Sequence, residues 1–388
     1  MLPPTATPSD APWWTMSNQN AVLPPLSVSR ASSLGSSRRP FGRLILEVRL
    51  DMPAWKQAVA VACSIVTGMF ISAVILVISG VPPADLVSEF ASNVFDRQSF
   101  QAVLVQAAPL ILVGIAASIG FRARFWNLGL EGQMVWGGIA ATAVSIYQIG
   151  PETLRLPLMA LFAMAAGMAW VAIPAFLRMQ FAVNEIISTL LLNYVATYFL
   201  YDLLYGPWKD ATDAYPHSPL YASTERLPDI GHGVNAALPL ALVFVLIVWW
   251  FAEFSRFGFY LKFIYANPAM GRLVGVPIVP VVWTAVLMSG ALAALGGFVV
   301  PSGIAARLTQ GFFEGYGFSG VLIAFLARNN AVAAAIVAVL IAMLFVTGQS
   351  FQIFYQIPFA MVQMIQAIIV MCVAASEFFI RHRIRLQR

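Results

Sequence analysis

The sequence predicts an all-α polytopic membrane protein with about ten transmembrane helices. Hydrophobic residues make up 60% of its 388 residues and charged residues only 10%, and its mean hydropathy is +0.80. A water-soluble domain carries roughly a quarter charged residues, so this composition argues against a soluble enzyme. The formal net charge of +5 does not indicate nucleic-acid binding, because the basic residues flank apolar segments in the positive-inside pattern.

The first segment, residues 1–53, is predicted to be a disordered cytoplasmic tail. It is rich in Pro, Ser and Thr and has no helical period. Arg38 and Arg39 resemble a twin-arginine export signal, but the apolar segment begins well downstream, near Gln57, and no small-residue cleavage site follows it. We therefore interpret these arginines as residues that hold this end in the cytosol.

Ten apolar segments follow, and each is long enough to cross a bilayer or to enter it part way. A membrane domain is therefore predicted over 54–380 and a basic cytoplasmic tail over 381–388. The eighth and ninth segments are short, so they could also form one bent unit. In order, the segments are 57–80, 100–121, 126–149, 156–177, 184–205, 234–253, 277–300, 316–327, 331–347 and 358–380.

The connections between these segments divide by charge. Basic residues follow the second, fourth and sixth segments and the last one, whereas acidic residues dominate the loops 81–99 and 206–233. By the positive-inside rule the basic connections are cytosolic. An even number of spans places both basic termini on that side.

A short echo indicates an internal repeat. Glu131-Gly132 opens the third span and Glu314-Gly315 opens the eighth, and each pair is followed by a further glycine at the same spacing. Five spans separate them, so they would run in opposite directions, which is the arrangement of an inverted repeat. Chance recurrence of a common residue pair is the competing explanation.

Catalytic, nucleotide-binding and metal-binding motifs are missing from the sequence. None of its three lysines follows a glycine, which excludes a phosphate-binding P-loop. Its three histidines have no metal-ligand spacing, and Cys63 and Cys372 lie far apart in apolar segments. We expect no cofactor and no metal, and any ATP hydrolysis would occur on another chain.

Polar residues at bilayer depth are the candidate functional residues, because they are costly there and usually face a cavity or a partner. Asn127, Glu131 and Gln133 follow a glycine-flanked break before the third span, beside Trp126. One interpretation is a translocation cavity with an aromatic wall. The other is a helix cap, with Glu131 favoured by the local dipole. Asn193 lies in the middle of the fifth span and could either join helices or line a cavity.

Two further local patterns predict structure. Gly290, Gly296 and Gly297 give the seventh span a small-residue face for close helix packing. In the 253–276 loop, Asn267 can cap a short helix that begins at Pro268 and ends near Gly275. This basic, aromatic element could lie on anionic lipid or dock into a soluble partner.

Four segments, in order, resemble one family, the permeases of ATP-binding-cassette importers of the nucleoside and simple-sugar branch. They are Phe125–Gln133 (FWNLGLEGQ), Asn184–Tyr194 (NEIISTLLLNY), Ala266–Val276 (ANPAMGRLVGV) and Gly315–Asn330 (GYGFSGVLIAFLARNN). Trp126, Leu130, Met270, Arg272 and Leu273 depart from the family pattern, which weakens any inference about the solute.

The resemblance implies a type II ABC importer-like permease in a bacterial inner membrane, with an internal inverted repeat. Its expected partners are a second permease, identical or paralogous, two cytosolic ATPase subunits and an external solute-binding protein. The translocation path would involve Trp126, Asn127, Glu131, Gln133, Asn193 and Glu314. The ATPase-coupling helix would contain Ala266, Asn267, Pro268, Gly271 and Arg272.

Within this expectation a nucleoside is the first candidate solute, and a pentose or hexose is the alternative. A different class, an ion-coupled secondary transporter working alone, would need a carboxylate at mid-membrane, for which Glu131 is the main candidate. A membrane-embedded enzyme would need a His, Asp or Glu constellation that the sequence does not offer.

Overall fold

The computed structural model describes residues 43–48, 53–86, 88, 91, 96–231 and 233–387. Most of the tail predicted over 1–53 therefore lies outside the described residues. Within that predicted tail, Arg43–Val48 forms strand β1. The chain divides into two compact units, which are described separately below.

The smaller unit contains the first and last described elements. They are β1, α2 (Ala54–Ile78), α14 (Phe359–Arg381) and β2 (His382–Gln387). β1 pairs antiparallel with β2, with Arg43 opposite Gln387, so two strands depart from the all-helical prediction. α2 and α14 pack closely at Gly68, where a Cβ would lie only 2.9 Å from the Cα of Ile369.

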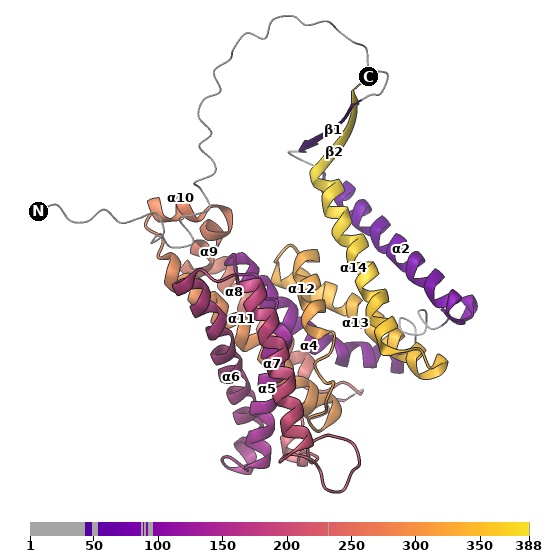
Figure 1. Cartoon of the computed structure of the whole chain (residues 1–388), viewed down its shortest axis with the longest axis vertical. Helices are drawn as coiled ribbons and strands as arrows, with labels where there is room; N and C mark the ends of the chain where they lie inside the picture. Colours follow the sequence, from indigo (N-terminus) through magenta and orange to yellow (C-terminus); the bar gives the residue numbers. More distant parts are fainter. Residues whose placement is uncertain are drawn as a thin grey trace, which may run out of the picture. The chain divides into compact units, whose positions relative to one another are not determined.

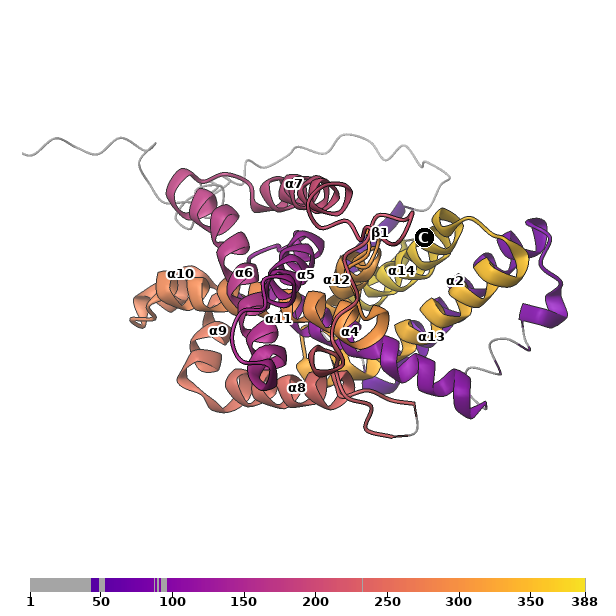
Figure 2. The same ribbon diagram turned by 90° about the horizontal axis from the view of Figure 1, so that it is seen from below.

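The larger unit is helical (Figures 1 and 2). Its first half holds α4 (Arg97–Arg122), α5 (Leu130–Ile146), α6 (Glu152–Phe181), α7 (Glu185–Tyr205) and the short turn η2 (Ser223–Glu225). Its second half holds α8 (Ala237–Phe254), α9 (Arg256–Ala266), α10 (Pro268–Leu273), α11 (Ile278–Val300), the π-helical turn η3 (Pro301–Ala305), α12 (Tyr316–Leu326) and α13 (Ala331–Tyr355).

α4 and α11 form the centre of this unit. α4 packs against α8, α11, α12 and α13, while α11 also packs against α5 and α6. The predicted small-residue face of α11 is confirmed. A Cβ on Gly290 would lie 2.6 Å from the carbonyl oxygen of Gly167 in α6, and one on Gly297 would lie 1.9 Å from that of Met134 in α5.

Each of the ten predicted apolar segments contains a helix, but the helices differ in length. Seven described helices are long and apolar enough to cross a membrane: α2, α4, α6, α7, α8, α11 with η3, and α13. α5 has 17 residues, α12 has 11, and the apolar part of α14 is also short. Length and composition therefore support a polytopic membrane protein with seven candidate spans.

Candidate functional site

The break before α5 is closed by a pair of buried side-chain amides. Asn127 donates to the side-chain oxygen of Gln133 over 3.0 Å, and Gln133 donates back over 2.8 Å. Asn127 also donates to Ser289 of α11 over 3.0 Å. Both amides are fully or almost fully buried, so their hydrogen bonds join α5 to α11. We call Asn127, Gln133 and Ser289 the amide cluster.

Asn193 ties α7 to the same break. Its side-chain oxygen accepts from the backbone N–H of Gly132 over 2.8 Å, and its nitrogen donates to the carbonyl of Leu128 over 3.1 Å. Gly132 leaves no room for a side chain, because a Cβ there would lie 2.9 Å from the Asn193 oxygen. Of the two roles predicted for Asn193, this geometry favours joining helices.

Glu131 belongs to the first turn of α5, and its side chain lies against the start of α12 rather than in an open cavity. Its carboxylate faces the backbone N–H groups of Gly315, Gly317 and Phe318. Those donors point out of the positive end of α12, where an anion is favoured. A Cβ on Gly317 would lie 2.2 Å from the Glu131 side chain, so this approach requires glycine. The geometry favours the capping interpretation, but Glu131, a residue of α5, caps the start of α12 and not that of α5.

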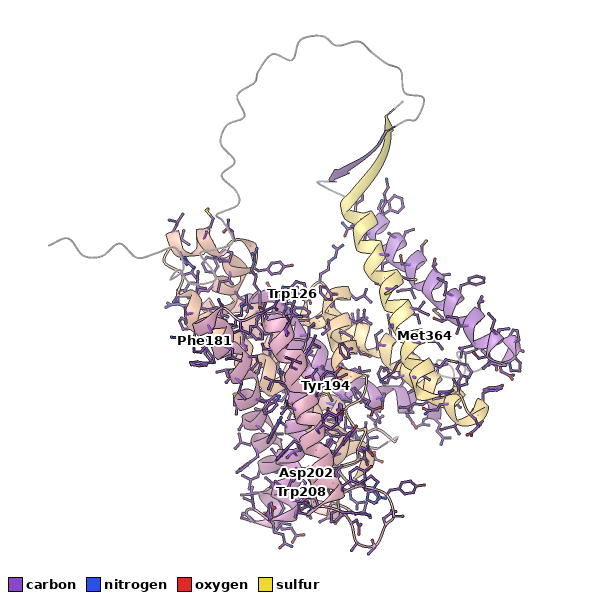
Figure 3. The ribbon with its side chains drawn as sticks, viewed as in Figure 1. Trp126, Phe181, Tyr194, Asp202, Trp208 and Met364 are labelled. Atoms are coloured by element: carbon purple, nitrogen blue, oxygen red, sulfur yellow. The ribbon has the colours of Figure 1, made fainter. Side chains whose placement is uncertain are left out.

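The other two predicted path residues lie nearer the surface. Trp126 is 43% exposed and packs against Phe121 and Phe325, with ring centroids 5.2 and 5.6 Å away. Glu314 is half-buried in the turn before α12 and close enough to Glu131 for their charges to interact. In Figure 3, Trp126 lies toward one end of the larger unit, and Asp202 and Trp208 lie toward the other.

The predicted coupling residues form a compact element at the end of the larger unit that carries α9 and α10 (Figure 1). The Asn267 side chain accepts from the backbone N–H of Ala269 over 2.9 Å, and Pro268 is the first residue of α10. The predicted cap and helix start are therefore confirmed. α10 ends at Leu273, two residues before Gly275. Gly271 faces inward, whereas Ala266 is exposed and Arg272 half-buried.

The surface of this element is apolar. Leu273 is 84% exposed, and Met270 and Val274 are also exposed. A concentrated apolar patch on an exposed turn indicates an interaction site.

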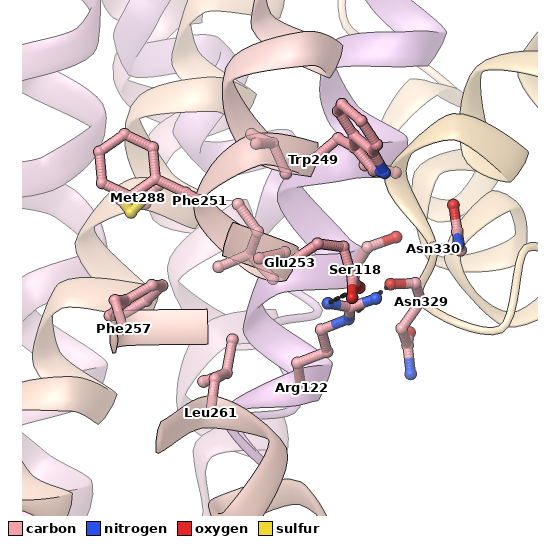
Figure 4. A pocket seen from close by; sticks show the side chains of 14 residues that line it. Ser118, Arg122, Trp249, Phe251, Glu253, Phe257, Leu261, Met288, Asn329 and Asn330 are labelled. Carbon is pink, nitrogen blue, oxygen red and sulfur yellow. Dashed lines mark hydrogen bonds and ion pairs between the residues drawn. The ribbon is translucent and has the colours of Figure 1, made fainter. Parts of the chain in front are cut away.

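A pocket lies behind α9, between α4, α8, α11 and the turn at 327–330 (Figure 4). Arg122 donates to the carbonyl of Asn329 over 2.7 Å and lies 3.6 Å from the carboxylate of Glu253. The pocket wall on the α9 side is apolar and includes Phe257 and Leu261.

At the opposite end, the loop 206–236 runs along residues 301–309. The backbone N–H of Ser218 donates to the carbonyl of Leu308 over 3.0 Å, and that of Tyr221 donates to the carbonyl of Ala306 over 2.9 Å. Sequence reasoning predicted this loop only as an acidic connection. Its pairing partner could not be found from the sequence, because it depends on which segments meet.

A buried ion pair fastens this loop to α5 and α6. Glu225 lies 2.7 Å from Arg155 of α6 and accepts from Ser145 of α5 over 2.5 Å. Burial alone would raise the pKa of Glu225, but the hydrogen bonds from Ser145, Arg155 and the backbone of Ala222 outweigh it and hold that pKa below its usual value of 4.5. The sequence contained no signal for this pair.

Ser289 and Arg124 are the other residues that sequence reasoning missed. Ser289 had a signal, since it is an isolated polar residue inside an apolar helix. Arg124 served only to indicate topology, although its side chain donates to the carbonyls of Tyr265 and Ala266, both over 3.1 Å.

The described part of the chain has the long apolar helices of a polytopic membrane protein. Residues 99–374 match the family described as branched-chain amino acid transport system / permease component, and the chain belongs to this family. It is therefore a permease subunit, the non-catalytic component of a transporter.

Curated relatives cover most of the chain. It is 34% identical to the glucose ABC transporter permease protein TsgB13 of Haloferax volcanii, over 88% of this chain and 93% of the relative. It is 30% identical to the guanosine ABC transporter permease protein NupP of Bacillus subtilis, over 81% and 92% of the two chains. The nucleoside ABC transporter permease protein NupB of Lactococcus lactis is 26% identical, over 81% and 89%.

Proposed function

We propose that this chain is the permease subunit of an ATP-binding-cassette importer for a nucleoside or a simple sugar. The observation that carries the proposal is the α9–α10 element, a capped, apolar-surfaced turn inside a permease of this family. The relatives named above are permeases for glucose, guanosine and nucleosides. These solutes share hydroxyl groups on a sugar ring, which is the chemistry we assign to the solute.

In the assembled importer, α9 and α10 would dock into a cytosolic ATPase subunit. Met270, Leu273 and Val274 offer the apolar contact, and Asn267 and Pro268 hold the turn that presents it. Two ATPase subunits, a second permease and an external solute-binding protein complete the proposed complex. We propose from the charge pattern that α9, α10 and both termini lie in the cytosol of a bacterial cell, with the chain in the inner membrane.

Ten crossings arranged as an inverted repeat remain our proposal for the topology. The packing supports it, because α4 contacts α12 and α13 just as α11 contacts α5 and α6. Gly137 and Gly320, which follow the two Glu-Gly pairs at the same spacing, both pack closely against a central helix. A Cβ on Gly137 of α5 would lie 2.1 Å from the carbonyl oxygen of Ala294 in α11, and one on Gly320 of α12 would lie 2.4 Å from Val113 in α4.

We propose that the solute path adjoins the meeting point of α5 and α12. Broken helices with opposed N-termini are a recurrent feature of transporter binding sites. Glu314 offers an accessible group there, and Trp126 offers an exposed ring beside Phe325 at the other end of α12.

Asn127, Gln133 and Asn193 are hydrogen-bonded within the protein, and Glu131 packs against the start of α12. In this conformation we therefore assign these four residues to the framework that shapes the path.

The test is co-purification of the tagged permease with its ATPase subunits from mild detergent. The unmodified chain should retain them, and Leu273→Asp should lose them, because a charge replaces the most exposed apolar contact of α10. The control is Leu220→Asp, because Leu220 is also an exposed apolar residue but lies in the loop 206–236. An exposed residue of α8 such as Val243 is unsuitable, since a charge there would lie inside the membrane. Equal retention by Leu273→Asp and Leu220→Asp would contradict the docking assignment.

A further inference from the structure

The segment Arg122–Asn127 connects several elements of the larger unit through three polar side chains. Arg122 binds the carbonyl of Asn329 and faces Glu253 of α8. Two residues later, Arg124 binds the last two carbonyls of α9. Asn127 enters the amide cluster with Gln133 and Ser289. Six consecutive residues therefore contact α8, α9, α11, α5 and the α12–α13 turn.

Phe125 fixes the middle of the segment. It is fully buried, and the guanidinium of Arg178 lies 5.3 Å from its ring centroid. Arg178 in turn pairs with Glu185 at the start of α7 over 2.8 Å. Arg124 adjoins this packed side chain, so a displacement of Arg124 must also move its neighbours, because packed interiors transmit strain.

Arg124 itself adopts a backbone conformation that indicates constraint. Its φ is +55°, in the left-handed region that non-glycine residues seldom occupy. Its side chain reaches α9 from this position and donates from Nε to Tyr265 and from Nη2 to Ala266. These two carbonyls lie directly before the capping Asn267, so Arg124 joins the segment to the junction between α9 and α10.

α9 is packed against the centre of the larger unit, because it contacts α4, α8 and α11. The small pocket in Figure 4 lies between its apolar face, with Phe257 and Leu261, and Met288 of α11. A displacement of α9 would therefore reach these helices through packed contacts as well as through Arg124.

We propose that Arg122–Asn127 is a transmission segment, and that Arg124 is the positioning residue that carries a displacement of α9–α10 to the amide cluster at the start of α5. From there the displacement reaches α12 through Glu131, which packs so closely on Gly317 that a Cβ there would lie 2.2 Å from its side chain. The inference rests on the proposed function, because it supposes that ATPase subunits move α9 and α10.

The experiment uses the whole complex of permease and ATPase subunits, with Cys63 and Cys372 replaced by serine and Phe318→Cys as a reporter. Phe318 is exposed and lies in the first turn of α12, so a maleimide can report its accessibility. Its labelling rate is compared between the nucleotide-free complex and the complex trapped with ATP and vanadate. No solute is needed.

In the unmodified chain we expect trapping to change the labelling rate at position 318. Arg124→Ala should reduce that change at least about fivefold, the lower end of typical coupling between sites, while ATPase co-purification is unchanged. Arg124→Lys keeps the charge and a single donor group, so it should restore part of the response.

Arg226→Ala is the matched control. Arg226 also donates from its guanidinium to a backbone carbonyl, that of Tyr221, over 3.0 and 2.8 Å, but it lies in the loop 206–236 and should leave the response intact. The proposal would be overturned if trapping changed the labelling rate at position 318 as much in Arg124→Ala as in the unmodified chain. It would also be overturned if trapping left that rate unchanged in the unmodified chain. Loss of ATPase from Arg124→Ala and Arg124→Lys alike would make Arg124 a docking residue and also overturn it. Failure of the unmodified chain to retain any ATPase would instead refute the proposed function.

Discussion

The buried amides of Asn127, Gln133 and Asn193 show how residues that would suit a solute can serve the framework instead. Each finds partners inside the protein, as buried polar groups generally must. Their residue types were predictable as important, since polar groups at bilayer depth are costly. Their partners were not, because Ser289 and Leu128 come from segments whose proximity only the fold determines.

Glu131 provides the sharpest test at the residue scale. Glu131→Ala would remove the carboxylate that faces the N–H groups of Gly315, Gly317 and Phe318, which we expect to destabilise the fold by about 1–3 kcal/mol. Glu131→Gln keeps an oxygen acceptor and should lose less. The melting temperature of the chain in detergent measures both.

Glu314→Ala is the control for this prediction, because Glu314 is the echoed glutamate and is half-buried. It should change the melting temperature less than Glu131→Ala does. If Glu131→Ala has the melting temperature of the unmodified chain and only transport falls, the capping role is wrong. Such a result would favour the interpretation that Glu131 lines a cavity.

At the scale of elements, hydrophobicity located the helices well but not their ends. All ten apolar segments contain helices, and the cap at Asn267 forms as predicted. α13 runs on to Tyr355, beyond the predicted end at 347, because Thr347, Gln349 and Ser350 lower the hydropathy without breaking the helix. The strands β1 and β2 were missed, since a two-stranded pair depends on a distant partner segment.

Helix packing around α11 gives a second prediction. Gly297→Ala would place a methyl group 1.9 Å from the carbonyl oxygen of Met134, which forces α5 and α11 apart at a cost of about 1–3 kcal/mol. Gly271→Ala, whose nearest neighbour would be 3.7 Å away, should be tolerated. Melting temperatures that fall equally for both would contradict close packing at Gly297.

The pair of Glu225 and Arg155 predicts a pH dependence of stability. Because the pKa of Glu225 is held below its usual value of 4.5 in the folded chain, its contribution is present above that value. It is lost as pH falls through the lower folded pKa. Glu225→Gln should destabilise the chain by about 2 kcal/mol near pH 7 and flatten the fall in melting temperature between pH 5 and pH 3, relative to the unmodified chain.

Glu152→Gln is the comparison for that experiment. Glu152 is exposed and accepts from Thr224 of the same loop over 3.2 Å, so its removal should leave the acid limb of the melting curve unchanged. An acid limb as steep in Glu225→Gln as in the unmodified chain would assign the pH dependence to other carboxylates.

The larger unit of this permease consists of two halves whose helices interlock. α5 packs on α11 and α12 packs on α4, and the Glu131 carboxylate bridges α5 and α12. Composition and charge pattern were enough to predict a polytopic membrane protein, because they reflect the solvent in which each segment lies. The sequence did not predict the contact between α5 and α12, and the inverted repeat indicated by the echo of Glu131 and Glu314 stays a prediction.

The most direct measurement of the central claim is uptake of labelled guanosine and glucose into liposomes that contain the permease with its co-purified ATPase subunits and binding protein. We expect uptake of at least one of them that requires ATP inside the liposome and stops with vanadate. Uptake by the permease alone, driven by an ion gradient and indifferent to ATP, would contradict it.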